Sequence, residues 1–166
     1  MKSIRLAWFA VLLVLVPMLV FAQDKADVKT MKYADLARLI RDNKGKVIVV
    51  DVWFFECTEC KKAMPHLVEM QRKYARDGLL AVTVNVDEEK EQKDKAIKFL
   101  QQTPIPVVNV LLDENQEVST KKLQVDSFPT VFVFNRAGKY VRFPSEEKLF
   151  TYKDVEKVAV DFLNEK

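Results

Sequence analysis

Residues 47–60 read VIVVDVWFFECTEC and carry the clearest structural signal in the chain. The first seven are apolar except for Asp51, a pattern typical of a strand that is buried on both faces of a sheet. The only two cysteines, Cys57 and Cys60, follow where the first turn of a helix is expected. There, free backbone N–H groups and the positive end of the helix dipole stabilise a thiolate. The spacing therefore predicts a reactive dithiol.

A structural staple and a metal site are the alternatives for this CxxC pair. A disulfide that closes a loop of only four residues constrains the unfolded chain very little, which argues against a staple. Zinc needs about four ligands, whereas the chain offers two cysteines and one histidine, His66. His66 follows Pro65 on the same expected helix, so we predict a surface histidine and no metal site.

The N-terminus has the pattern of a secretory signal peptide. Lys2 and Arg5 precede an apolar run from Leu6 to Phe21, and small residues stand before a cleavage site after Ala22. The run of about 16 residues is shorter than the roughly 20 that a spanning helix needs, and Pro17 interrupts it. We therefore expect residues 1–22 to be removed on export, with a retained membrane anchor as the alternative.

The remaining residues, 23–166, are sufficient for one domain with a hydrophobic core. Without Lys2 and Arg5 they carry 25 basic residues against 24 acidic ones, a balance that argues against nucleic-acid binding. Glycine is scarce, and no repeat or low-complexity linker divides the chain. In an oxidising compartment the two cysteines would form a disulfide unless a donor keeps them reduced.

Helical and strand patterns alternate along the rest of the chain. Apolar residues at helical spacing predict helices, and β-branched runs predict strands. The expected helices cover 31–43, 57–76, 88–102 and a last segment that starts near Thr151 and Asp154, and the further strands cover 79–86, 107–112, 130–135 and 139–143. Residues 116–124 form either a short helix or an irregular crossover. Alternation favours parallel strands, and the closing hairpin around residues 135–138 adds antiparallel ones. The predicted architecture is a mixed α/β sandwich.

Two segments of the chain resemble thioredoxin-fold proteins. Residues 50–65 are similar to the active-site segment of that family, with an aspartate six residues before the first cysteine and a proline five after the second. Residues 127–130, Ser-Phe-Pro-Thr, resemble its cis-proline loop. The additional strand and helix within 79–112 resemble the insertion of exported TlpA/ResA-like thioredoxins. The resemblance implies a thioredoxin-like α/β fold: a central mixed sheet flanked by helices, with an extra strand–helix insertion between the CxxC helix and the cis-proline loop.

The resemblance also implies roles for individual residues. Cys57 would attack a substrate disulfide, and Cys60 would resolve the mixed disulfide. Asp51, with its pKa raised by desolvation, would exchange a proton with Cys60. The residues expected to contact the partner chain are Phe128, Pro129 in the cis form, Trp53 and Glu56. Trp53 is at the same time a candidate for the core.

Two departures from the family pattern concern the surroundings of the dithiol. Glu56 stands where the family usually has a tryptophan, and Ala63 stands where many ResA-like members have a glutamate. Glu56 and Glu59 place negative charge next to Cys57, and this disfavours a thiolate, although Lys61 and Lys62 offset part of it. A dithiol with a less stabilised thiolate is more reducing. We therefore predict a reductase.

The predicted function is that of an exported thiol-disulfide oxidoreductase. It would reduce disulfides in other exported proteins, for which the resemblance suggests cytochrome c maturation or a similar pathway. It would need no cofactor and no metal, would draw electrons from a membrane dithiol donor, and would act as a monomer in the periplasm or another extracytoplasmic space. The alternatives are a disulfide oxidase or isomerase, and a non-catalytic thioredoxin-fold module that binds a partner while its disulfide stays closed.

Overall fold

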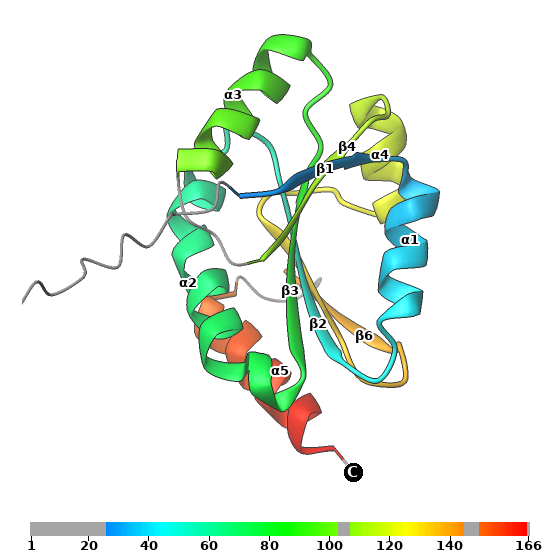
Figure 1. The fold of residues 1–166 in the computed structure, drawn as a ribbon, viewed down its shortest axis with the longest axis vertical. Coiled ribbons are helices and arrows are strands. Elements are labelled where there is room, and N and C mark those ends of the chain that lie inside the picture. The colour runs from blue at the N-terminus through cyan, green and yellow to red at the C-terminus, as the bar shows by residue number, and fades with distance from the viewer. Residues whose placement is uncertain (1–25, 103–106, 145–149, 166) are drawn as a thin grey trace, which may run out of the picture.

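The computed structural model describes residues 26–102, 107–144 and 150–165, in which six strands form one sheet with helices on both faces (Figure 1). The expected signal peptide, residues 1–22, lies outside the described residues. In chain order the elements are β1 (Val28–Met31), α1 (Tyr33–Asp42), β2 (Val47–Trp53), α2 (Thr58–Tyr74), the short 3-10 helix η1 (Ala75–Asp77), β3 (Leu79–Asn85), α3 (Lys90–Gln102), β4 (Val108–Leu112), α4 (Gln116–Leu123), β5 (Thr130–Phe134), β6 (Tyr140–Phe143) and α5 (Tyr152–Asn164).

The sheet is mixed, as the sequence pattern predicted. Its strand order is β1-β4-β3-β2-β5-β6. Strands β1, β4, β3 and β2 run parallel to one another. Strand β5 runs antiparallel to β2, and β6 runs antiparallel to β5. Along the chain, helix α3 and strand β4 come after helix α2 and before the cis-proline loop. In the sheet, β4 lies between β1 and β3. The expected strand–helix insertion is therefore confirmed.

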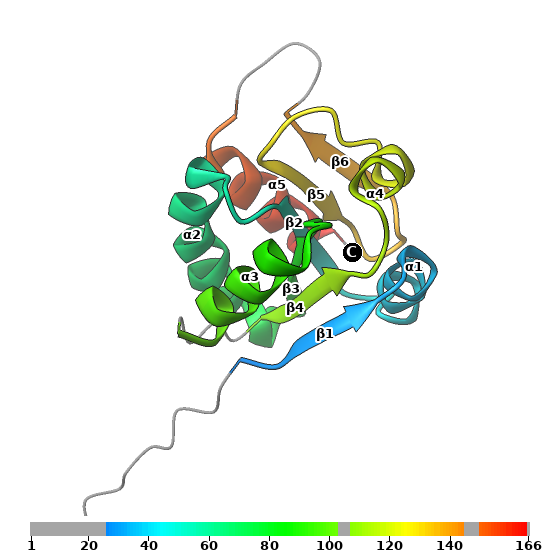
Figure 2. The same cartoon turned by 90° about the horizontal axis from the view of Figure 1, so that it is seen from above.

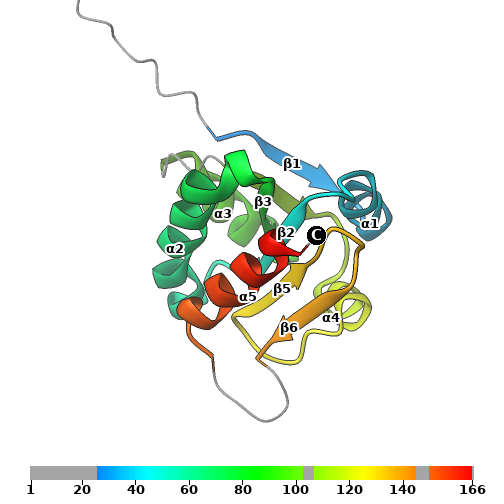
Figure 3. The ribbon, with the colours of Figure 1, turned by 90° about the horizontal axis from the view of Figure 1, so that it is seen from below.

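Strand β2 is the centre of the fold because it is buried on both faces. From Val47 to Val52 its apolar side chains alternate between two apolar clusters, since successive residues of a strand point to opposite faces. Val49 packs in the cluster that contains Leu67 of α2 and Val155 of α5. Val50 packs in the cluster that contains Leu36 of α1. Figures 2 and 3 show the same division, with α2, α3 and α5 on one face and α1 and α4 on the other.

Most predicted elements are present, with ends shifted by a few residues. The last helix begins with a capping box in which the Thr151 backbone N–H donates to Asp154 (2.8 Å), as its sequence suggested. Strand β1 was not predicted. Its four residues do not alternate between apolar and polar side chains, and none of them is fully buried. Only the pairing with β4 therefore defines it as a strand. Among the helices described, none has the length and apolar character needed to cross a membrane.

Candidate active site

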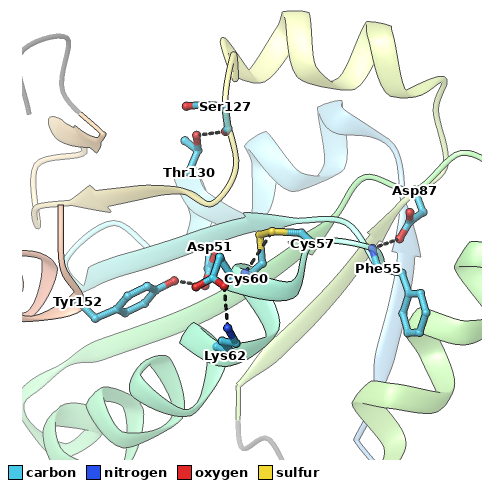
Figure 4. Close-up of a disulfide and its surroundings, with 10 residues drawn as sticks. Asp51, Phe55, Cys57, Cys60, Lys62, Asp87, Ser127, Thr130 and Tyr152 are labelled. Carbon is cyan, nitrogen blue, oxygen red and sulfur yellow. Dashed lines mark hydrogen bonds and ion pairs between the residues drawn. A yellow bond between two sulfur atoms is a disulfide. The ribbon is translucent and has the colours of Figure 1, made fainter. Parts of the chain in front are cut away.

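The two cysteines form a disulfide at the N-terminus of α2 (Figure 4). Cys57 is the N-cap residue of the helix, and the Cys60 backbone N–H donates to its Sγ (3.1 Å). Cys57 retains 8% exposure, while Cys60 is 0% exposed. Of the two cysteines, only Cys57 keeps any contact with solvent, and it lies where the helix dipole favours negative charge.

A buried aspartate holds the loop that leads from β2 to the disulfide. Asp87, 5% exposed, accepts hydrogen bonds from the Phe55 backbone N–H (2.8 Å) and from Nδ2 of Asn85 (2.7 Å). The Val86 backbone N–H in turn donates to the carbonyl of Trp53 (3.0 Å). Sequence reasoning missed Asp87. The available signal was a pair of polar residues directly after buried strand β3, which is the neighbour of β2.

Three partly exposed aromatic side chains, Phe54, Phe55 and Phe128, pack against the cluster that contains the disulfide. Phe54 and Phe128 meet edge to face, with ring centroids 4.9 Å apart, and both are partly exposed. The Lys61 ammonium lies 4.4 Å from the ring centroid of Phe55. The tertiary structure thus brings the cis-proline loop beside the active-site loop, and the Phe128–Pro129 peptide bond is cis, as predicted.

The remaining residues that were expected to bind a partner differ in their exposure to solvent. Glu56 is exposed, and Pro129 is partly exposed, so both are accessible. The expectation that Trp53 contacts a partner is wrong for this conformation, because its side chain is 0% exposed. Its ring lies against Phe99 of α3, with centroids 5.8 Å apart. The insertion therefore covers Trp53 and makes it a core residue.

Asp51 is the one carboxylate in the middle of β2, and it is fully buried. Burial raises its pKa from 3.8 to about 7, because desolvation disfavours the charged form, and a hydrogen bond from the Tyr152 hydroxyl lowers it in part. Tyr152 comes from the first turn of α5 and donates to Oδ2 of Asp51 (Figure 4). Oδ1 is buried with no hydrogen-bond partner among the described residues. The raised pKa predicted for Asp51 is thus confirmed.

Sequence reasoning missed Tyr152, which lies 101 residues from Asp51. No local pattern marks this tyrosine, since it occupies an ordinary position at the start of a helix. Its ring stacks on His66, with centroids 5.6 Å apart. In the part of the chain that the structure describes, no three histidine, cysteine or acidic side chains converge to hold a metal ion.

A mixed sheet with a CxxC disulfide at a helix N-terminus, beside a cis-proline loop, defines the class of thioredoxin-fold dithiol proteins. Residues 45–140 match the family model described as thioredoxin-like, and the chain belongs to this family. The expected likeness to ResA-type proteins is also confirmed.

The sequence similarity to ResA covers part of each protein. The chain is 30% identical to the thiol-disulfide oxidoreductase ResA of Bacillus subtilis over 125 residues, which cover 75% of this chain and 64% of that protein. It is also 30% identical to a protein of the same name from Bacillus thuringiensis over 104 residues, 62% of this chain and 57% of that one. The chain therefore spans less than two thirds of the length of these relatives.

Solved structures agree with this placement. A protein assigned as the thiol:disulfide interchange protein DsbE of Chlorobium tepidum aligns with a TM-score of 0.60 and 26% identity, over 75% of this chain and 85% of that chain. The thioredoxin domain of a thiol-disulfide oxidoreductase from Bacteroides vulgatus aligns with a TM-score of 0.55 and 27% identity, over 72% and 83% of the two chains.

Proposed function

We propose that the protein is an exported thiol-disulfide oxidoreductase that reduces disulfides in other exported proteins. One observation carries the proposal: the disulfide joins a residue that keeps some exposure, Cys57, to one that is fully buried, Cys60. This asymmetry separates attack from resolution. The ResA relatives, which are named thiol-disulfide oxidoreductases, support the same activity.

In the reduced protein the Cys57 thiolate attacks one sulfur of a substrate disulfide. The substrate S–S bond breaks, a mixed disulfide forms, and the first substrate sulfur leaves as a thiolate that takes up a proton. Cys60 then passes its proton to Asp51 and attacks the sulfur of Cys57. The mixed disulfide breaks, the second substrate thiolate leaves, and the Cys57–Cys60 disulfide forms. Two electrons have moved from the dithiol to the substrate.

The surroundings of Cys57 suit a polypeptide substrate. Phe54, Phe55 and Phe128 offer partly exposed aromatic surface against the cluster that contains Cys57, with Pro129 in the adjacent loop. Glu56 adds an exposed carboxylate to the rim. We assign the contact with the partner chain to this surface. Cysteine pairs of exported proteins, such as those of apocytochrome c, are the substrates that the ResA likeness suggests.

The charges beside the dithiol support the proposed direction of electron flow. Glu59 pairs with Lys62 (2.8 Å), and both side chains are largely exposed. Glu56 is compensated only in part, because Lys95, which interacts with it, also pairs with Glu91 (2.7 Å), and Lys61 lies over the ring of Phe55. The remaining negative charge near Cys57 disfavours the thiolate and makes the dithiol more reducing. Sustained turnover then requires an external dithiol donor, which we place at the membrane.

The reduction potential of the Cys57–Cys60 pair tests the proposed direction. The protein is equilibrated against glutathione or dithiothreitol, and the fluorescence of Trp53 reports the redox state, since its ring packs in the same cluster as both cysteines. A potential of about −250 mV or lower supports a reductase, and one between about −120 and −180 mV would make the protein an oxidase or isomerase. A pair that does not cycle would refute the enzyme and favour a binding module.

A second experiment tests substrate handling directly. In the Cys60→Ser variant the attack by Cys57 remains but the resolving thiol is absent, so mixed disulfides with substrate proteins should accumulate. Cys57→Ser is the matched control, because it removes the attacking sulfur and leaves only the fully buried Cys60, so it should trap nothing. Equal trapping by the two variants would contradict the assignment of Cys57 as the attacking residue.

A further inference from the structure

The C-terminal helix contributes a side chain to the buried acid of the site. We infer that Tyr152 is a positioning residue for the proton transfer at Asp51: its hydroxyl holds one carboxylate oxygen and leaves the other to exchange a proton with Cys60. This inference rests on the proposed function. It adds a residue to the site from a helix that lies far from the CxxC motif in sequence.

The placement of Asp51 follows from the alternation along β2. Asp51 lies between Val49 and Trp53 on the same face of the strand. Val49 packs in a cluster with residues of α2 and α5, and Trp53 packs in a cluster with Cys60. The Asp51 carboxyl therefore lies under the junction of α2 and α5, where one helix brings Cys60 and the other brings Tyr152.

The two oxygens of the carboxyl have different surroundings. Oδ2 accepts the hydrogen bond of Tyr152, whereas Oδ1 is buried without a partner among the described residues. A buried oxygen without a hydrogen bond destabilises the fold, unless it gains a partner when the disulfide is reduced. Figure 4 shows Tyr152 pointing at the carboxyl from one side, with the disulfide on the other side in this view. Oδ1 is thus the atom available to the thiol that appears when the disulfide is reduced.

The phenol is held in place and remains protonated. Its ring stacks on His66 of α2 at an interplanar angle of 26° and lies next to Phe150, with centroids 6.1 Å apart. Burial raises the pKa of Tyr152 well above its usual value, and the neighbouring Asp51 raises it further. Because the hydroxyl keeps its proton, it donates to the carboxylate throughout the working pH range.

The titratable groups around the pair come from two helices. Helix α2 brings Cys60 and His66, and helix α5 brings Glu156, which pairs with Lys73 (2.9 Å). The neighbouring strands place only uncharged residues, Thr83 of β3 and Val131 of β5, beside Asp51 in the register. The Tyr152 hydroxyl is therefore the polar group of the described protein that acts most directly on the ionisation of Asp51.

The chemical consequence concerns the resolving step. The proton of the Cys60 thiol moves to Oδ1 of Asp51, and the sulfur keeps the electron pair with which it attacks Cys57. A hydrogen bond to the carboxylate favours the charged form, so Tyr152 keeps Asp51 competent as a base near neutral pH. Without the hydroxyl, the pKa of Asp51 rises and the resolving step slows on the acid side.

The test is the Tyr152→Phe variant, which keeps the ring and removes only the hydroxyl. The rate of insulin disulfide reduction is measured from pH 5.5 to 9 for the variant and the wild type. We expect the acid inflection to move up by about one pH unit, a several-fold lower rate near pH 6, and an equal rate near pH 9. A profile that is lowered equally at all pH values, or unchanged, would overturn the inference.

Three controls separate positioning from a structural effect. Tyr140→Phe alters an exposed tyrosine on β6 and should leave the profile unchanged. In an Asp51→Asn background, Tyr152→Phe should no longer move the profile, because the group it acts through is absent. The carbon-13 resonance of the Asp51 carboxyl, titrated in the oxidised protein, should show the same upward shift in Tyr152→Phe.

The carboxyl titration also keeps the two proposals apart. A wild-type protein that reduces no insulin would refute the proposed function, and the titration of Asp51 would then decide the role of Tyr152 by itself. A wild-type protein that reduces insulin, combined with an unshifted Asp51 titration in Tyr152→Phe, would refute the role of Tyr152 and leave the proposed function standing.

Discussion

Replacing Asp51 with asparagine should remove a pH-dependent loss of stability that the buried carboxyl imposes on the fold. The pKa of Asp51 is about 7 in the folded protein, against 3.8 for an unperturbed aspartate. Because the folded value is the higher one, the folded state binds the proton more tightly than the unfolded state. The contribution of Asp51 to stability is therefore greatest below pH 4, falls as the pH rises toward 7, and is constant above that.

The size of the effect follows from the two pKa values. A difference of about three units at about 1.4 kcal/mol each amounts to about 4 kcal/mol of unfolding free energy lost between pH 4 and pH 8. Asparagine keeps an oxygen that can accept from Tyr152 but does not titrate. The unfolding free energy of Asp51→Asn relative to wild type should thus increase by about 4 kcal/mol over this range.

Urea unfolding of the oxidised protein, followed by the fluorescence of the buried Trp53, measures this difference at several pH values. The same substitution at the exposed Asp161 is the matched control and should leave the wild-type profile in place. If the difference between Asp51→Asn and wild type were the same at pH 4 and pH 8, the reasoning that burial raises the pKa of Asp51 would be refuted.

Three further predictions concern the supports of the site. Asp87→Asn should weaken the hydrogen bond to the Phe55 backbone, with a loss of about 1–2 kcal/mol in urea unfolding; no loss would show that the loop does not depend on it. Arg136→Ala should cost about 2 kcal/mol by the same assay, because the guanidinium donates to carbonyls of three separate segments; an unchanged midpoint would contradict this. Glu59→Gln should raise the reduction potential, measured against glutathione, by on the order of 10 mV, since the charge beside Cys57 is exposed; a lowered potential would reverse the sign of the argument.

Much of the fold could be predicted because its signals are local. The apolar run of β2 indicates a doubly buried strand, and the capping pair Thr151 and Asp154 indicates the start of α5. These features depend on side-chain periodicity and on hydrogen bonds between residues close in sequence. Strand β1 lacks such a signal, since its pairing with β4 alone makes it part of the sheet.

The candidate site was predictable only in part for the same reason. The cysteines and Asp51 stand on one strand and the following helix turn, so their spacing in sequence already places them together. Burial of Trp53 depends on Phe99 of the inserted helix α3, which no pattern around Trp53 reveals. The expected role of Trp53 in partner binding was therefore wrong.

The sequence by itself determined the buried strand, the dithiol at a helix N-terminus, the mixed sheet and the cis-proline, Pro129. The tertiary structure alone decided which side chains complete that site: Asp87 beneath the active-site loop, Phe128 against Phe54, and Tyr152 on Asp51. The physical reason is that local structure follows from the periodicity of apolar residues and from nearby hydrogen bonds, whereas contacts between distant residues exist only after whole helices and strands have packed. The hydrogen bond between Tyr152 and Asp51 joins residues 101 positions apart, and it lowers in part the pKa that burial raises.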